Sequence, residues 1–189
     1  MNLHQVEQTG RRAVHSRRAG LLVCLLVCSL VCILLSACTL GAPAVGDPAP
    51  DFTLPILYKH SVSLSGYKGS PVVLFFFATW CSYCVQEIPG LLSMQARYQN
   101  QDLNTLAINM TCDDKMEAVE ALVKNQKWFF YPFLDPDCST AKKYRVSSIP
   151  VTFFIDREQI IRSIHRGYAS PEEIEAGIKK IIPKITPAR

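Results

Sequence analysis

The sequence predicts one α/β domain whose parallel or mixed β-sheet carries helices on both faces. Residues 72–77 are all apolar, with no polar side chain at alternate positions, which is typical of a strand buried on both faces. Further apolar segments of strand length alternate with segments of helical periodicity, an order typical of α/β proteins. About 140 residues remain once the first 50 are set aside, and such a length suffices to bury one core.

Two features mark the first half of this domain. Residues 52–57 and 61–64 are short and strand-like on either side of the polar Tyr58-Lys59-His60, which predicts an N-terminal β-hairpin. Residues 84–98 carry apolar side chains spaced for one broad helical face. Pro89 lies inside this predicted helix and should kink it, because proline removes a backbone donor.

The second half continues the alternation of strands and helices. The sequence predicts a strand over 103–110, an amphipathic helix over 115–124, a strand over 129–134 broken by Pro132, a short helix over 139–144, and strands over 151–155 and 160–165. The final helix has the clearest start. Ser170 is its expected N-cap, Pro171 occupies its first position, and Glu173 completes a capping box.

The first 37 residues differ in composition from the rest and predict an export signal. Arginines at 11, 12, 17 and 18 precede an apolar run over 21–35, which is shorter than the roughly 20 residues of a spanning helix. The ending Leu35-Ser36-Ala37-Cys38 resembles the lipobox of bacterial lipoproteins. That resemblance implies a lipoprotein signal peptide over 1–37 and a lipid on Cys38. An uncleaved signal anchor is the alternative, and either interpretation predicts an extracytoplasmic, membrane-anchored domain.

Charge and cysteine content limit the classes of function that the chain could have. Residues 38–189 contain 16 Lys and Arg against 15 Asp and Glu, so no basic stripe indicates nucleic-acid binding. Residues 38–50 are small and proline-rich, which predicts a flexible tether ahead of a domain over 51–185. Three of the eight cysteines lie in the apolar run and count as hydrophobic residues. With Cys38 lipidated, four cysteines remain, and an oxidising compartment permits two disulfides.

Cys81 and Cys84 lie where the buried strand over 72–77 passes into a helix. The first turn of a helix has unpaired N–H groups and the positive end of the dipole, which stabilise a thiolate. Cys81 is therefore expected to be the exposed nucleophile with a lowered pKa, and Cys84, one turn later, the resolving thiol. Zinc would need two further ligands at matching spacing, so no metal is expected. A purely structural disulfide would leave the adjacent Trp80 unexplained.

The segment Phe76–Cys84, FFATWCSYC, followed by Glu87-Ile88-Pro89, resembles the active site of the membrane-anchored TlpA/ResA group of thiol–disulfide oxidoreductases. Ser148-Ile149-Pro150 is similar to the cis-proline loop of thioredoxin-fold proteins. The resemblance covers roughly residues 46–182. It implies a thioredoxin-like fold: a central mixed β-sheet flanked by helices, with an N-terminal β-hairpin and a central βα insertion.

The resemblance also implies roles for individual residues. Pro150 would be a cis-proline facing Cys81 and Cys84, and the Ile149 backbone together with Trp80 would contact the client chain. Glu87 matches the acidic residue that the group carries after its second cysteine. Since it lies three residues after Cys84, both should share one helix face, and burial should raise the Glu87 pKa and make it a proton acceptor for Cys84. A solvated glutamate in the first turns of the helix is the alternative.

Cys112 and Cys138 each follow a predicted strand. If those strands are parallel neighbours, both cysteines emerge at the same sheet edge, where a bridge could form. A structural disulfide, two free thiols and a second redox relay all remain open, because the Cα separation is not in the sequence.

The predicted function is an extracytoplasmic thiol–disulfide oxidoreductase acting as a protein-disulfide reductase, with no cofactor beyond its dithiol. The resemblance implies cysteine-containing clients, such as apocytochrome c or copper-site proteins, a membrane electron donor and a monomeric state. Three alternatives remain: a thiol peroxidase, although Ala78 and Leu74 stand where peroxidases carry threonine and proline; a copper-binding assembly factor; and a disulfide-forming oxidant. Ser82-Tyr83 departs from the proline-containing pairs of the group, which leaves the reduction potential open.

Overall fold

The computed structural model describes residues 41–182. The predicted signal peptide over 1–37 and the predicted lipidation site Cys38 lie outside the described residues. Within 41–182 no helix is long and apolar enough to cross a membrane.

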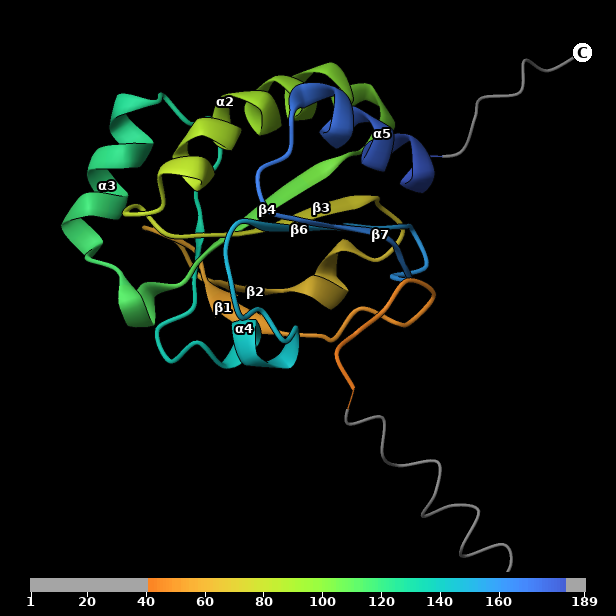
Figure 1. Cartoon of the computed structure of the whole chain (residues 1–189), viewed down its shortest axis with the longest axis horizontal. Helices are drawn as coiled ribbons and strands as arrows, with labels where there is room; N and C mark the ends of the chain where they lie inside the picture. Colours follow the sequence, from red (N-terminus) through yellow and green to blue (C-terminus); the bar gives the residue numbers. More distant parts are fainter. Residues whose placement is uncertain (1–40, 183–189) are drawn as a thin grey trace, which may run out of the picture. The chain divides into compact units, whose positions relative to one another are not determined.

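The centre of the domain is a five-stranded mixed sheet in the order β5-β4-β3-β6-β7 (Figure 1). Its strands are β3 (Val72–Phe77), β4 (Asn104–Asn109), β5 (Phe133–Leu134), β6 (Val151–Ile155) and β7 (Ile161–Arg166). The pairs β3–β4 and β4–β5 are parallel, whereas β3–β6 and β6–β7 are antiparallel. The α/β class and the mixed sheet expected from the sequence are therefore confirmed.

Two layers cover the sheet (Figure 1). Helices α2 (Ser82–Arg97) and α5 (Pro171–Ile181) pack together on one face. The hairpin of β1 (Thr53–Pro55) and β2 (Ser61–Ser63) lies on the other face with α4 (Ser139–Lys143). Helix α3 (Met116–Asn125) follows β4, and α4 follows β5.

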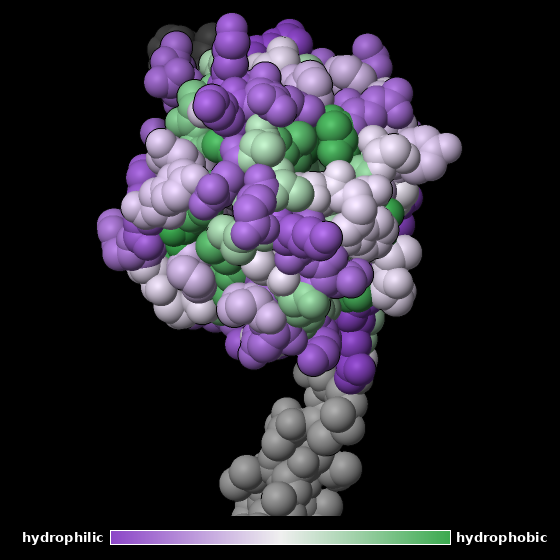
Figure 2. Space-filling view, turned by 90° about the vertical axis from the view of Figure 1, so that its left-hand side faces the viewer, coloured by the Kyte–Doolittle hydropathy of each residue, from purple (hydrophilic) through white to green (hydrophobic). Residues whose placement is uncertain are grey.

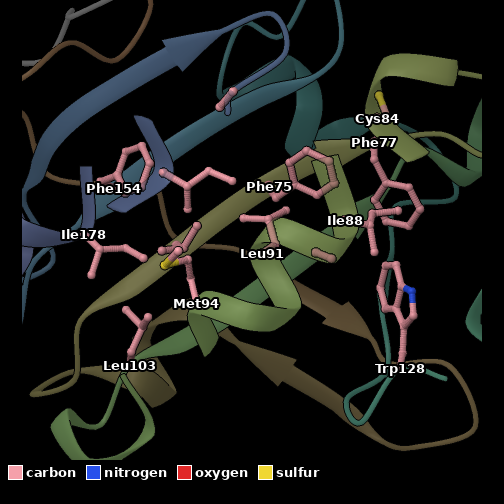
Figure 3. Close-up of a cluster of buried hydrophobic side chains, with 14 of the residues drawn as sticks. Phe75, Phe77, Cys84, Ile88, Leu91, Met94, Leu103, Trp128, Phe154 and Ile178 are labelled. Atoms are coloured by element: carbon pink, nitrogen blue, oxygen red, sulfur yellow. The ribbon is translucent and has the colours of Figure 1, made fainter. Parts of the chain in front are cut away.

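Strand β3 shows why its sequence has no polar positions. Phe75 and Phe77 face the α2 and α5 layer, and their rings stack 5.7 Å apart (Figure 3). Leu74 and Phe76 face the hairpin and α4. Both faces of β3 are thus buried core, because side chains alternate across a strand and both of its faces are covered.

The helix starts follow their sequence signals. Ser170 caps α5 by accepting a hydrogen bond from the Glu173 N–H, while the Glu173 carboxylate accepts one from the Ser170 N–H. Pro171 stands at the start of α5.

Pro89 does not end the helix in which it lies. Helix α2 runs as one α-helix from Ser82 to Arg97, with Pro89 inside it.

Two expectations from the sequence were wrong. The strand predicted over 129–134 is reduced to Phe133–Leu134, directly after Pro132, because a proline offers no N–H to a neighbouring strand. Phe129, expected in the core, is 60 % exposed. The tether predicted over 38–50 is, from Gly46 onward, bonded to the domain. The Gly46 N–H donates to the Ile161 carbonyl at 2.8 Å, and the Ala49 N–H donates to the Gln159 carbonyl at 2.8 Å. This segment therefore covers the outer edge of the sheet at the start of β7.

Candidate active site

The Cys81–Cys84 pair is a disulfide at the N-terminus of α2, with a Cα–Cα distance of 5.2 Å. Cys81 is the N-cap residue, and its sulfur accepts the Cys84 N–H at 3.2 Å. A cysteine sulfur thus takes the position that Ser or Asp usually occupies at a helix start. β3 ends at Phe77, so only Ala78-Thr79-Trp80 separate the buried strand from the first sulfur.

The two sulfurs differ in access, although less than the sequence indicated. Cys84 is fully buried beneath the helix layer, against Phe77 (Figure 3). Cys81, expected to be exposed, is only 8 % exposed in the disulfide state. The cis-proline loop partly covers it, since the Cys81 sulfur lies 3.8 Å from the Ile149 carbonyl oxygen. Of the two cysteines, only Cys81 keeps any exposed surface.

The Ile149–Pro150 peptide bond is cis and immediately precedes β6. The Pro150 carbonyl accepts a hydrogen bond from the Gly167 N–H at 2.9 Å. The pairing of β6 with β3 brings this loop against the helix start, and the Ile149 carbonyl faces Cys81.

Glu87 lies in α2 and is only 1 % exposed. Its two oxygens are bonded separately: Thr152 Oγ1 donates to Oε1 at 3.1 Å, and the Ala169 N–H donates to Oε2 at 3.0 Å. Burial raises the pKa of the Glu87 carboxyl, and these two hydrogen bonds only partly offset the effect. The alternative of a solvated glutamate is therefore contradicted. Glu87 and Cys84 are both buried on the same face of α2, as their spacing predicted.

Trp80 is 60 % exposed, and its indole N–H donates to the Asp113 carbonyl at 2.7 Å. The neighbouring Asp114 carboxylate organises the same segment. It accepts the Thr79 N–H at 2.6 Å, the Thr79 hydroxyl at 2.5 Å and the Asn109 side-chain amide at 2.8 Å. Asp114 therefore fixes the turn between β3 and Cys81 to the end of β4.

Sequence reasoning missed Asp114. One signal was available: Asp113 and Asp114 follow the strand predicted over 103–110, the next along the chain after 72–77, and parallel neighbouring strands end at the same edge of a sheet. A polar residue just after one strand can therefore reach the residues just after the other. Two adjacent aspartates in a loop are common enough that the sequence alone did not single them out.

Replacing Asp114 by asparagine should slow disulfide exchange about tenfold, because an amide cannot accept all three hydrogen bonds and the Trp80 turn loosens. The measurement is the rate at which the reduced protein reduces a disulfide peptide. Asp113→Asn is the matched control, since Asp113 accepts the Trp80 indole N–H through its backbone carbonyl, which the substitution keeps. Equal rates for the two variants would show that Asp114 has no positioning role.

Aromatic side chains and a hollow border the pair. Tyr83 lies between Cys81 and Cys84 in the sequence, and its ring centroid is 6.4 Å from that of Tyr168. On the other side, a hollow of about 540 Å³ extends from Trp80 toward α3. It is lined by Thr79, Trp80, Cys112, Asp113, Asp114, Lys115 and Ala118. The face on the α3 side is mostly hydrophilic, with small separate apolar areas (Figure 2).

Cys112 and Cys138 form the second disulfide, with a Cα–Cα distance of 5.6 Å. Cys112 lies in the single turn η3 (Thr111–Asp113) after β4, and Cys138 precedes α4 after β5. Because β4 and β5 are parallel neighbours, both cysteines emerge at the same edge of the sheet. In the chain from 41 to 182, no group of three or more His, Cys, Asp and Glu side chains could hold a metal ion.

A dithiol pair at a helix start, facing a cis-proline loop on a mixed sheet, defines a thiol–disulfide oxidoreductase of thioredoxin-like fold. Comparison with known proteins agrees. Residues 45–164 match the AhpC/TSA family, so the chain belongs to that family. Thiol-disulfide oxidoreductase ResA of Geobacillus kaustophilus (strain HTA426) is 33 % identical over 142 residues, covering 75 % of this chain and 80 % of that protein.

Two further relatives extend the likeness. Thioredoxin-like protein YneN of Bacillus subtilis (strain 168) is 34 % identical over 130 residues, covering 69 % of this chain and 76 % of that protein. The crystal structure of a protein described as thiol:disulfide interchange protein DsbE of Chlorobium tepidum superposes with a TM-score of 0.67 and 32 % identity. That superposition covers 72 % of this chain and 96 % of the other.

Proposed function

We propose that this thiol–disulfide oxidoreductase works as a reductase of disulfides in cysteine-containing client proteins outside the cytoplasm. The observation that carries the proposal is the unequal access of the pair: Cys81 keeps 8 % of its surface exposed, whereas Cys84 is fully buried on the helix face that also carries the buried Glu87. Such a pair can attack a client with one sulfur and release it with the other.

The reaction has two steps. The Cys81 thiolate attacks a client disulfide, so that a Cys81–client bond forms, the client disulfide breaks, and the second client sulfur leaves as a thiolate that takes up a proton. The Cys84 thiol then gives its proton to Glu87 and attacks the Cys81 sulfur. The client leaves with two thiols, and the Cys81–Cys84 disulfide of the structure is formed. The client is reduced by two electrons and the pair is oxidised by two.

The surroundings of the pair favour the reducing direction. A strongly oxidising pair is one whose reduced thiolate form is stabilised. Here Cys84 is fully buried among apolar side chains, and an acidic residue, Glu87, lies on the same face of α2. Both features disfavour a thiolate at Cys84 and therefore favour the disulfide, which makes the dithiol a better electron donor.

The location and partners belong to the same proposal. The signal and lipobox features of residues 1–38 support a lipid-anchored protein on the outer side of a bacterial membrane, and two disulfides suit an oxidising compartment. Each cycle leaves the Cys81–Cys84 pair oxidised, and it must be reduced again before the next. We therefore propose a membrane electron donor. The dithiol would act without a cofactor, and the protein would act as a monomer on clients such as apocytochrome c or copper-site proteins.

The test runs the exchange in both directions. Reduced protein is mixed with a peptide that carries a disulfide between two cysteines, and oxidised protein with the reduced peptide, and the peptide products are separated by mass. The proposal predicts nearly complete peptide reduction in the first mixture and little peptide oxidation in the second. The opposite result would assign a disulfide-forming role.

Replacing Glu87 by glutamine should slow the resolving step about 10²-fold, because the amide cannot take the Cys84 proton and a positioned base contributes at least that much. Rapid mixing of the reduced variant with a disulfide peptide should show a long-lived Cys81–client mixed disulfide. Glu172→Gln, an exposed acid at the start of α5, is the control. An unchanged rate between pH 6 and 9 would exclude Glu87 as the acceptor.

The same substitution has a second expected effect, on stability. Because burial raises the Glu87 pKa, the folded state holds this proton more tightly than the unfolded chain does. The stability that the protonated carboxyl contributes is complete at pH values below the ordinary glutamate pKa and is lost as pH rises through the raised value. The glutamine variant should therefore gain stability relative to the parent as pH rises, while exchange slows. Urea titrations at acid and neutral pH measure the difference.

A further inference from the structure

The backbones of Cys112 and Cys138 are held together independently of their disulfide. The N–H groups of both cysteines donate to the same carbonyl oxygen, that of Asp135, each at 3.2 Å. Asp135 is fully buried, and its carboxylate accepts the N–H groups of Thr140 at 3.2 Å and Ala141 at 2.9 Å. Breaking the S–S bond leaves these hydrogen bonds in place, so the two thiols would remain neighbours and could close again.

The two sulfurs of this pair differ in access, as do those of the first pair. Cys112 is exposed and lines the hollow beside Trp80, whereas Cys138 is 7 % exposed and lies in the core beneath the sheet. An incoming thiolate can therefore approach Cys112, and Cys138 is placed as the sulfur that leaves and later resolves.

The Cys112 turn also holds the active-site segment. Asp113, the next residue, accepts the Trp80 indole N–H through its carbonyl, and Asp114 binds Thr79 through its carboxylate. Cys112 and the Trp80 segment line one hollow. Opening or closing the disulfide at Cys112 therefore acts one residue before Asp113 and two before Asp114, the residues that position the start of α2.

We propose that Cys112–Cys138 is a second reversible thiol–disulfide pair, opened at Cys112 by protein dithiols that enter the hollow beside Trp80. The first thiolate of the incoming dithiol attacks the Cys112 sulfur, the Cys112–Cys138 bond breaks, and Cys138 leaves as a thiolate and takes up a proton. The second thiol of the dithiol then attacks the first sulfur of the same dithiol, which is bonded to Cys112. That bond breaks, and Cys112 leaves as a thiolate and takes up a proton. The dithiol is oxidised to a disulfide, and the pair gains two electrons and two protons. This activity is separate from that of the Cys81–Cys84 pair.

The first test uses the purified full-length chain without substitutions. The folded protein is equilibrated in a series of reduced and oxidised dithiothreitol mixtures, free thiols are alkylated, and peptide mapping measures each cysteine separately. We expect Cys112 and Cys138 to become alkylated together, in the range of dithiothreitol mixtures that also reduces the Cys81–Cys84 disulfide. If they gain it only after denaturant is added, while Cys81 and Cys84 titrate, the second pair is inert and the proposal is overturned.

The second test compares two variants in a Cys81→Ser, Cys84→Ser background. Cys138→Ser leaves the exposed Cys112 thiol and should form a mixed disulfide with oxidised glutathione at least tenfold faster than Cys112→Ser, which leaves the buried Cys138. Equal rates would overturn the assignment of Cys112 as the attacked sulfur. In the same background with both cysteines present, opening the pair should change Trp80 fluorescence, and Trp80→Phe should abolish that change. No change on opening would show that the pair does not reach the Trp80 segment.

Discussion

Replacing Cys81 by serine should lower the rate of disulfide exchange by at least about 10³-fold, because the other sulfur of the pair is buried and a hydroxyl is a far weaker nucleophile than a thiolate. Cys84→Ser should behave differently. Attack by Cys81 on the client remains possible, but no thiol is left to resolve the product, so a covalent protein–client complex should accumulate. The two variants therefore separate the first step from the second.

Both variants are assayed with the same disulfide peptide, and denaturing gels without reductant detect the covalent complex. Ser93→Ala, on the exposed face of α2, is the control for an unrelated change in the same helix. If Cys81→Ser formed a stable complex and Cys84→Ser did not, the roles of the two sulfurs would be reversed.

The Gly177→Ala substitution should lower the free energy of unfolding by about 3 kcal/mol, at the upper end of the range for overpacked cores. A Cβ atom at Gly177 would lie 2.3–2.5 Å from ring atoms of Phe154, which is buried between β6 and the helix layer (Figure 3). Neither α5 nor the ring can move without disturbing the packing of its neighbours. The clash outweighs the gain of roughly 1 kcal/mol that alanine brings to a helix interior.

Gly90→Ala in α2 is the matched control. Its nearest contact would be the flexible end of Ile174, with Cδ1 at 3.3 Å, so we expect a change within about 1 kcal/mol of the parent. Urea titrations of both variants measure the two free energies. A Gly177→Ala protein as stable as the Gly90→Ala protein would mean that α5 does not pack against Phe154 as described.

The sequence predicted the features that depend on local pattern. The all-apolar 72–77 segment indicated a strand covered on both faces, and Ser170, Pro171 and Glu173 marked the start of α5. Helix periodicity also placed Glu87 on the face of Cys84, although a solvated glutamate stayed open until the structure showed its burial.

Features that depend on long-range contacts were not predictable in the same way. The burial of Cys81 depends on the Ile149 carbonyl, which is 68 residues away in sequence. Asp114 is recognisable as a positioning residue only when β4 is placed beside β3. The segment after Gly46 resembles a linker in composition, yet its backbone finds partners at the edge of the sheet. For Cys112 and Cys138, the sequence predicted only that a bridge could form if the two preceding strands were parallel neighbours; that pairing and the Cα distance come from the structure.

The most direct test of the proposed reductase is the reduction potential of the Cys81–Cys84 pair. The protein is equilibrated with defined thiol–disulfide buffers, and the pair is followed by Trp80 fluorescence and by alkylation of Cys81. We expect a midpoint below roughly −220 mV, in the range of thioredoxin and the glutaredoxins. A midpoint near roughly −120 mV, beside the strongest oxidants of this class, would contradict the reductase and assign a disulfide-forming role.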